Sequence, residues 1–293
     1  MNPTDLPQGP APNPHPRKPR FTLPAGACDS HCHIYGPFAQ FPLPDDRSFT
    51  PHEVPESALH AMHDKLGFAR AVIVQSQGHG FDHGPVLAAL RDDPGRYRGV
   101  ALIRREDSEQ TVAELDAAGF CGVRFSFMAH LGGEPDLATV RDVIAKVKPF
   151  GWHVAIHVAG QGMVKYADFI GSIDATVVID HMGRPPVAEG ANGPAVTELR
   201  RLLDRGNIWV KISGADRLSA EGPPYRDALS IPASLVRHAP ERIVWGSDWP
   251  HVNLHGPMPD DGELVDLLAE VAPDERTRHR ILVENPADLF GFP

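Results

Sequence analysis

Two histidines separated by one residue, His31 and His33, stand where the chain first becomes rich in apolar residues. Residues two apart on a β-strand point to the same side, so both imidazoles can converge on one point. An imidazole pair of this kind can bind a metal ion or stabilise a developing negative charge. Later apolar runs also end in polar residues, namely His157, the segment 180–185 and the segment 245–251. These positions are the candidates for a shared catalytic site.

The length and composition of the chain restrict the class of protein. A chain of 293 residues with 42% hydrophobic content can bury a large core, as one α/β barrel or as two smaller domains, and we favour one domain. A formal net charge of -10 argues against a nucleic-acid partner, and no apolar run is long enough to span a membrane. The three cysteines, Cys28, Cys32 and Cys121, are an odd number, which indicates buried thiols in a reducing compartment and predicts a cytoplasmic protein.

The first 24 residues are the part of the chain least suited to a core. They contain eight prolines and few large apolar side chains, so they cannot bury enough surface to offset the entropy lost on ordering. We predict an extended proline-rich arm at 1–24 and a folded domain at 25–293, with the basic stretch 17–20 as a solvated tail. Packing of the arm across a partner subunit, as in a homo-oligomer, stays open.

Short apolar runs rich in β-branched residues alternate with amphipathic stretches along the rest of the chain. Eight runs are found, at 27–33, 71–77, 99–103, 122–127, 153–158, 176–181, 208–213 and 243–248. The part of one run at 71–74 (AVIV) is apolar throughout, as is typical of a parallel strand buried on both faces. Eight strand–helix units predict a (β/α)8 TIM barrel. A doubly wound open sheet is the alternative, but it would carry a glycine-rich phosphate loop after the first strand.

The polar residues stand near the carboxyl ends of these predicted strands, where a barrel places its active site. Buried polar groups need partners, so several in one cavity indicate a functional site. Each residue alone has a plainer interpretation: His157 as a core histidine, Asp248 as a helix cap, and Arg184 as half of a structural ion pair. Arg124 lies among apolar strand residues, so its guanidinium needs an anionic partner.

Four segments together resemble the 2-pyrone-4,6-dicarboxylate lactonases of the amidohydrolase superfamily. They are 29–33 (DSHCH), 67–75 (GFARAVIVQ), 178–185 (VIDHMGRP) and 245–251 (WGSDWPH). The similarity runs from the end of the arm to the carboxyl terminus with matching order and spacing. It implies a distorted (β/α)8 barrel that hydrolyses a lactone in the breakdown of aromatic compounds.

The resemblance also implies roles for individual residues. His31, His33 and His181 would polarise the lactone carbonyl, Asp248 would activate water and later protonate the leaving oxygen, and Arg124, Arg184 and Arg217 would hold the anionic groups of the substrate. Ser76, Gln77, His130, His251 and Asn253 complete the predicted substrate-binding set.

The chain departs from the lactonase pattern at the end of the fifth strand. The pyrone lactonases carry a tyrosine there and work without a divalent metal, whereas His157 resembles the metal-binding relatives. We therefore hypothesise one divalent metal ion, Zn²⁺ in preference to Mn²⁺, held by His31, His33, His157 and Asp248. His181 would then act as a base or orient the bound water. A metal-free mechanism led by Asp248 is the alternative.

The predicted substrate is a small anionic lactone. His130 stands where the lactonases carry a further carboxylate-binding arginine, so 4-sulfomuconolactone or a carboxylated muconolactone rivals 2-pyrone-4,6-dicarboxylate as the substrate. A metal-dependent non-oxidative decarboxylase of the same superfamily is the alternative enzyme. A barrel that only binds its ligand would need degenerate site residues, and those named above are intact.

Overall fold

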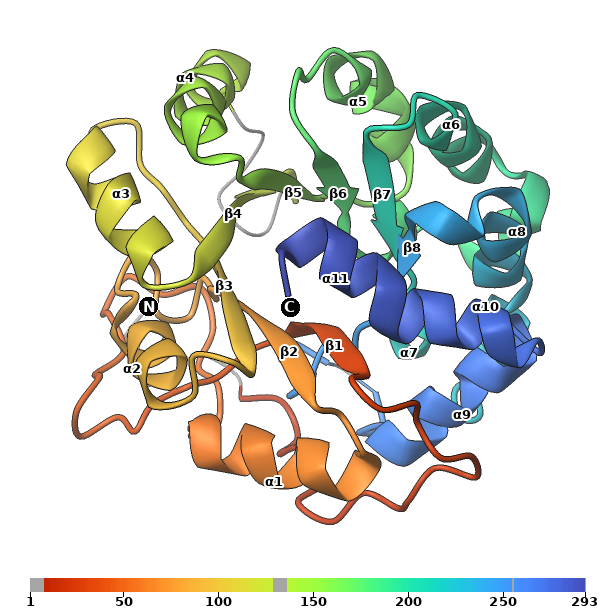
Figure 1. Cartoon of the computed structure of the whole chain (residues 1–293). Helices are drawn as coiled ribbons and strands as arrows, with labels where there is room; N and C mark the ends of the chain where they lie inside the picture. Colours follow the sequence, from red (N-terminus) through yellow and green to blue (C-terminus); the bar gives the residue numbers. More distant parts are fainter. Residues whose placement is uncertain (1–7, 129–135, 255, 293) are drawn as a thin grey trace.

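The computed structural model describes residues 8–128, 136–254 and 256–292, and it has eight parallel strands in sequence order. The strands are β1 (Cys28–Cys32), β2 (Arg70–Val74), β3 (Tyr97–Ala101), β4 (Phe120–Ser126), β5 (His153–His157), β6 (Val177–Ile179), β7 (Ile208–Lys211) and β8 (Ile243–Val244). Helices separate the strands and surround the sheet (Figure 1). The prediction of a (β/α)8 barrel is confirmed. Each of the eight strands overlaps the run of residues predicted for it.

Burial on both faces explains why these apolar runs form parallel strands. In β2, Val72 and Val74 point into the barrel, where they pack with inward-facing residues of other strands such as Val100 and Val178. Ala71 and Ile73 alternate with them and pack in the larger core between the sheet and its helices. Such a strand has no solvent-exposed face and reads as a continuous apolar run.

The barrel is distorted where its last strand meets its first. β8 spans only two residues, and the chain beyond it continues along β1 through backbone hydrogen bonds. The backbone N–H of Ser30 donates to the Trp245 carbonyl oxygen at 2.9 Å, and that of His33 donates to Trp249 at 2.8 Å. Between them, the N–H of Asp248 donates to the His31 carbonyl oxygen at 2.8 Å. The irregular closure therefore fixes Asp248 against the histidine pair.

The helices cover the outside of the barrel and one of its ends. They are α1 (Glu56–Leu66), α2 (Gly84–Asp92), α3 (Glu109–Ala117), α4 (Leu137–Val147), α5 (Gln161–Gly171), α6 (Pro194–Leu203), α7 (Ala215–Leu218), α8 (Ser230–His238), α9 (Asp261–Val271), α10 (Glu275–His279) and α11 (Asn285–Phe290). α11 crosses the end of the barrel at which the strands begin (Figure 1), where Phe290 and Phe292 join the interior cluster. The candidate site lies at the opposite end of the barrel, where the strands finish. Within the described residues, no helix is both long and apolar enough to cross a membrane.

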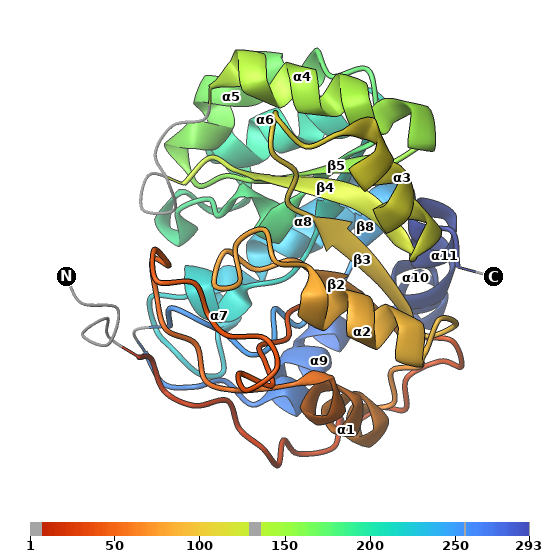
Figure 2. The same ribbon diagram turned by 90° about the vertical axis from the view of Figure 1, so that its left-hand side faces the viewer.

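The arm, described from residue 8, lies against the chain's own barrel and passes α9 (Figure 2). The expectation that 17–20 is a solvated tail is wrong, because Arg17 forms an ion pair of 2.5 Å with Asp266 and the N–H of Arg20 donates to the same carboxylate. Two side chains in the arm's path, Asp260 and Asp266, supply the acceptors. The predicted boundary between residues 24 and 25 stays a prediction.

Candidate active site

A cavity of about 560 Å³ lies at the carboxyl ends of the strands. Its volume is typical of sites for small ligands. The predicted site residues that line it are His33, Ser76, Gln77, Arg124, His157, His181, Arg184, Arg217, Asp248 and Asn253. His31 is fully buried beside them. The predicted residue His130 lies outside the described residues.

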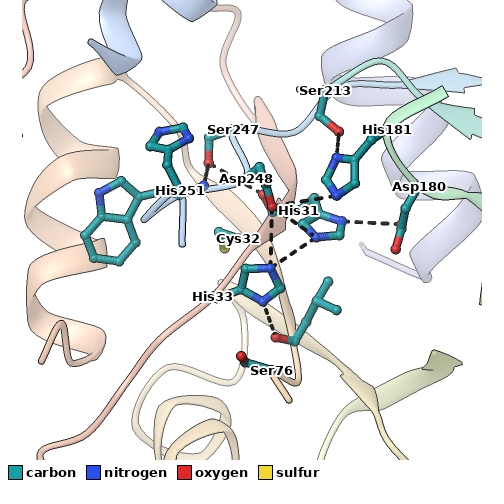
Figure 3. A network of polar contacts seen from close by, with 12 residues as sticks. His31, Cys32, His33, Ser76, Asp180, His181, Ser213, Ser247, Asp248 and His251 are labelled. Carbon is teal, nitrogen blue, oxygen red and sulfur yellow. Dashed lines mark hydrogen bonds and ion pairs between the residues drawn. The ribbon is translucent and has the colours of Figure 1, made fainter. Parts of the chain in front are cut away.

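Four side chains point toward one another at this cavity (Figure 3). His31 Nε2 lies 3.3 Å from His33 Nε2, and Asp248 Oδ1 lies 3.6 Å from the first and 3.5 Å from the second. His181 Nε2 lies 3.7 Å from the same carboxylate oxygen. The structure thus brings together three imidazoles and one carboxylate. The first and last of these residues in the sequence, His31 and Asp248, are more than 200 residues apart.

Local hydrogen bonds orient two of these imidazoles. His33 Nδ1 lies 2.7 Å from the backbone oxygen of Val74, which can only accept, so this nitrogen carries the proton and the lone pair of Nε2 faces the cluster. His181 Nδ1 lies 2.8 Å from Ser213 Oγ. His181 itself follows β6 in the left-handed conformation, at φ 51°, which turns its side chain back over the strand ends. Short β6 thus places His181 in a turn and not at a strand end.

Three of the four convergent atoms, those of His31, His33 and Asp248, fit a divalent cation, whereas His181 is grouped with His31 and Asp180 instead. A tetrahedral zinc site has ligands at about 2.1 Å from the ion, which gives ligand–ligand separations of about 3.4 Å. The separations from Asp248 Oδ1 and between His31 and His33 are 3.3–3.7 Å, and the donor set of imidazoles with one carboxylate is the one that Zn²⁺ and Mn²⁺ accept. His31, His33 and Asp248 are one of the groups whose ligand atoms all lie within 4.8 Å of one another.

His157, the fourth predicted metal ligand, belongs to none of these groups in the described part of the chain. It ends β5 and lines the cavity, with its ring centroid 5.4 Å from that of His181. Both of its ring nitrogens are buried and have no hydrogen-bond partner among the described residues. Burial, with Arg124 nearby, holds the pKa of His157 well below its usual value, so the imidazole is neutral. The fourth position of the hypothesised metal site is thus open between His157 and His181.

A fully buried lysine that the sequence analysis missed lies next to the cluster. Lys211, the last residue of β7, donates from Nζ to His31 Nδ1 at 3.2 Å and lies 3.2 Å from Asp180 Oδ1. Asp180 also accepts from Arg124 Nε at 2.8 Å. Burial and the Lys211 ammonium lower the pKa of His31 to about 4, which keeps this imidazole neutral. The sequence does contain a signal for this residue, because Lys211 is a lone cation at the end of the otherwise apolar run 208–211.

The anionic partner expected for Arg124 is Asp180. Among the described contacts, Asp180 forms no ion pair with Arg184. Asp180 is fully buried, yet Lys211, His31 and Arg124 outweigh burial and hold the pKa of its carboxyl well below the usual range. Arg124 contributes to the wall of the cavity while its Nε is committed to this carboxylate. Arg124 therefore has a structural role in addition to the predicted role in substrate binding.

Asp248 is buried and ionised. Burial alone would raise the pKa of its carboxyl, but Arg217 and His181 hold it well below the usual range. Arg217 Nε donates to Oδ2 at 2.6 Å, which leaves Oδ1 to face the imidazoles. Asp248 adopts the left-handed conformation with φ 63°, which asparagine and aspartate tolerate better than other residues with side chains.

Arg184 is the cavity arginine that the chain leaves without an ion-pair partner, as far as the described residues show. Its Nε is buried without a hydrogen bond. Burial and the neighbouring Arg217 guanidinium lower the pKa of Arg184 to about 10, which leaves it charged at neutral pH. A half-buried guanidinium without an ion-pair partner among the described residues is a candidate site for an anionic ligand in this cavity.

A second buried network, also missed, joins the strands that carry the cluster. Asp29 Oδ2 accepts from the Ser247 hydroxyl at 2.5 Å and from His63 Nε2 at 3.1 Å, while Oδ1 accepts from the backbone of Ser247 at 2.9 Å and of His31 at 3.1 Å. These bonds fix β1 against the segment after β8. The aspartate two residues before His31 thus positions the site without entering the cavity.

The predicted substrate residue His251 lies behind the cavity wall. Its side chain is fully buried, with Nε2 3.0 Å from Asp261 Oδ1 and Nδ1 3.8 Å from Asp216 Oδ2. Although burial opposes it, the Asp261 carboxylate raises the pKa of His251. Its backbone N–H donates to the Asp248 carbonyl oxygen at 2.9 Å. His251 therefore supports the turn that presents Asp248.

A parallel eight-stranded barrel with imidazoles and a carboxylate gathered at the carboxyl ends of its strands has the architecture of a barrel enzyme. The chain belongs to the amidohydrolase family Amidohydro_2, whose model matches residues 28–292. The predicted resemblance to the pyrone dicarboxylate lactonases is confirmed by the relatives described next.

Two relatives with curated names act on lactones. The 2-pyrone-4,6-dicarboxylate hydrolase of Comamonas testosteroni is 38% identical over 285 residues, with 94% of this chain and 93% of the relative covered. The 4-sulfomuconolactone hydrolase of Rhizobium radiobacter is 36% identical over 274 residues, with 92% of each covered. Among solved structures, an Acinetobacter baumannii protein described as a "probable 2-pyrone-4,6-dicarboxylic acid hydrolase", with citric acid bound, matches at a TM-score of 0.80 and 26% identity, covering 91% of this chain and 100% of that one.

Proposed function

We propose that this chain is a lactonase, a carboxylic ester hydrolase that opens a small anionic lactone in the breakdown of aromatic compounds. One observation carries the proposal: a buried carboxylate, Asp248, faces three imidazoles in a cavity that also holds Arg184, which has no ion-pair partner among the described residues. The pairing of a proton acceptor with a fixed cation suits an ester that carries a negative group. Lactone hydrolysis by similar chains supports it.

Asp248 is the residue that takes up the proton of the attacking water. With so low a pKa it is a weak base until its positive neighbours are offset. The negative groups of a lactone bound beside Arg217 and Arg184 supply that offset and raise the pKa of Asp248 toward the working pH. The proton then passes to the alkoxide oxygen that leaves the ring, so Asp248 returns to the carboxylate. The coupling makes turnover depend on the anionic group of the substrate.

We expect Arg184→Ala to raise KM for an anionic lactone by roughly 10- to 100-fold with a smaller loss in kcat, because a charge-assisted hydrogen bond is worth about 1.5–3 kcal/mol. Steady-state kinetics measure this. Arg201→Ala is the matched control, because Arg201 pairs with Asp168 and Glu198 on the outer surface. An unchanged KM in Arg184→Ala would remove this residue from the binding site. Arg124→Ala should lower both kcat/KM and the free energy of unfolding, since it also removes one of the two cations that pair with Asp180.

We further propose that His31, His33 and Asp248 hold one divalent ion, Zn²⁺ in preference to Mn²⁺, with His157 or His181 as the fourth ligand. When bound, such an ion supplies Lewis-acid polarisation of the ester carbonyl and a lowered pKa of water. The fit of the donor atoms described above supports this. A metal-free reaction in which the imidazoles polarise the carbonyl is the alternative.

Elemental analysis of protein purified without chelator should find a single zinc or manganese ion per chain. Chelation should reduce kcat, and restoring the metal should recover it, while His33→Ala should lower the bound metal because Nε2 of His33 is one of the ligands. A stoichiometry near zero with chelator-resistant activity would reject the metal and favour the metal-free scheme.

The choice of substrate is tested with a pH-indicator assay over 2-pyrone-4,6-dicarboxylate, 4-sulfomuconolactone and uncharged lactones, with and without added metal. Lactone opening releases a proton for each turnover. Release of carbon dioxide in place of a ring-opened acid would favour the decarboxylase. Citrate, a small tricarboxylate, serves as a non-reacting probe of the same cavity by calorimetry.

We propose a cytoplasmic location for this enzyme. The three cysteines are free thiols in the structure, as expected of a reducing compartment. A homo-oligomer stays a prediction, which light scattering would test, and the arm lies on its own barrel.

A further inference from the structure

The arm reaches the mouth of the catalytic cavity. Gln8 and Gly9 line the same cavity as Arg217 and Asp248. Gln8 Nε2 donates to the carbonyl oxygen of Pro51 at 3.2 Å. The backbone oxygen of Gly9 accepts from the His52 side chain at 2.9 Å. These contacts fix the start of the described arm to the loop that follows β1.

The arm is also enclosed on its other side. A Cβ placed on Gly9 would lie 3.2 Å from the carbonyl oxygen of Leu254, which leaves no room for a larger residue without movement. The arm residues Gly9, Pro10 and Pro12 line a small pocket together with the segments 49–52 and 250–253. Both segments also contribute to the wall of the catalytic cavity. The arm therefore lies between two loops that shape the site.

A clamp of charged groups holds the arm further along. Asp260, the N-cap of α9, accepts from the backbone N–H of Arg17 at 3.0 Å and from the Asn13 side chain at 3.0 Å. The Arg17 guanidinium lies 2.5 Å from Asp266, which is largely buried. Next to this clamp the arm backbone packs directly on Gly262, where an added Cβ would overlap the Arg17 carbonyl oxygen.

The composition of the arm favours docking once these contacts exist. Prolines restrict the conformations of the undocked chain, so less entropy is lost when the arm is ordered. Figure 2 shows the arm, in red, following the outside of the barrel past α9. The eight prolines, from which we predicted an unpacked arm, are therefore equally consistent with an extended arm that is docked on the barrel.

We propose that the arm is a wall of the substrate cavity and that Gln8 is a specificity-determining residue, whose carboxamide contacts the anionic ligand at the mouth. The arm thereby restricts which lactones fit. The identity of the ligand rests on the proposed function, whereas the position of the arm in the cavity wall does not.

The most informative variant is Gly262→Ala. Alanine has a higher helix propensity than glycine, and the one atom that the substitution adds, the Cβ, overlaps the backbone of Arg17 in the arm. Gly95→Ala is its matched control, since a Cβ at Gly95 meets nothing within 4 Å. A second variant lacks residues 1–12, which removes Gln8 and Gly9 outright, and Gln8→Ala removes the carboxamide alone. Each full-length variant is digested briefly with trypsin, which cuts after Arg17 and Arg20, and all are titrated with citrate by calorimetry.

Gly262→Ala should speed cleavage of the arm and weaken citrate binding, each by about tenfold, the change that 1.4 kcal/mol produces, while Gly95→Ala changes neither. The truncated chain should bind citrate as weakly as Gly262→Ala does, with Gln8→Ala between it and the parent. Citrate should slow the cleavage of the parent, because binding and docking are linked. For a lactone substrate, KM should rise in the same order with a smaller change in kcat.

Citrate affinity that is unchanged in the truncated chain would overturn the proposal, as would faster cleavage in Gly262→Ala with unaltered binding. Citrate binding that depends on the arm, in a protein that opens no lactone, would instead overturn the proposed function and leave this inference standing. Equal loss in the truncated chain and in Gln8→Ala would assign the whole effect to the carboxamide.

Discussion

Asp248→Asn should lower kcat for lactone opening by at least about 10³-fold, because the amide cannot take up the proton of the attacking water. The fold itself should be kept. Asparagine matches aspartate in size and tolerates the left-handed backbone at this position, where φ is 63°. The substitution frees Arg217, whose Nε now donates to the carboxylate at 2.6 Å. Citrate should therefore bind Asp248→Asn at least as tightly as the parent chain.

Rapid-mixing kinetics and calorimetry on the same protein separate these two expectations. Asp168→Asn is the matched control, because the Asp168 side chain is 97% exposed and pairs only with Arg201 on the outer surface, among the described contacts. A fully active Asp248→Asn would contradict the assignment of Asp248. Loss of citrate binding together with loss of turnover would make Asp248 a binding residue and would move the proton transfer to an imidazole.

The barrel could be predicted from the sequence because each strand leaves a local signature. A strand buried on both faces must be apolar throughout, and the run at 71–74 shows this without any knowledge of its partners. The strand lengths could not be predicted equally well. β6 and β8 end at Ile179 and Val244, so His181 and Asp248 stand on turns with left-handed residues. These turns depend on contacts with β1 and β7, which are distant in sequence.

The gathering of the imidazoles with Asp248 could likewise be expected, because strand ends of a closed barrel share one mouth. The pairing among the charged residues could not. Whether Arg124 meets Asp180 or a ligand depends on the register between β4 and the turn after β6, and single-residue shifts change it. The course of the arm was missed for a similar reason, since the acceptors that hold Arg17 lie about 250 residues away, at Asp260 and Asp266.

The fully buried Lys211 carries the second large expected effect. Its ammonium offsets part of the charge of Asp180, which also pairs with Arg124. Lys211→Met keeps much of the side-chain volume but removes the cation, so Asp180 retains one cationic partner among the described residues. Breaking a buried pair by removing one partner costs about 3–5 kcal/mol, and we expect a loss of this size in the free energy of unfolding. Denaturant titration measures it.

The matched control for stability is Lys148→Met, because Lys148 and Asp174 form a pair at the surface, where such pairs contribute about 0–1 kcal/mol. Adding Asp180→Asn to Lys211→Met should recover part of the loss, since the buried carboxylate that lost one of its two cationic partners is then neutral. A Lys211→Met chain as stable as the parent would show that Asp180 is neutralised by other means.

Lys211→Met should also change the affinity of the site for a divalent cation. The ammonium lies 3.2 Å from Nδ1 of His31 and donates to it, so it both repels a cation at Nε2 and favours the tautomer whose Nε2 carries the proton. With the lysine removed, Nδ1 of His31 can donate to Asp180 Oδ1, which lies 3.4 Å away, and Nε2 becomes a free ligand. Zinc should therefore bind Lys211→Met more tightly than the parent in a chelator competition. Equal zinc affinity in both chains would show that Lys211 acts on the fold alone.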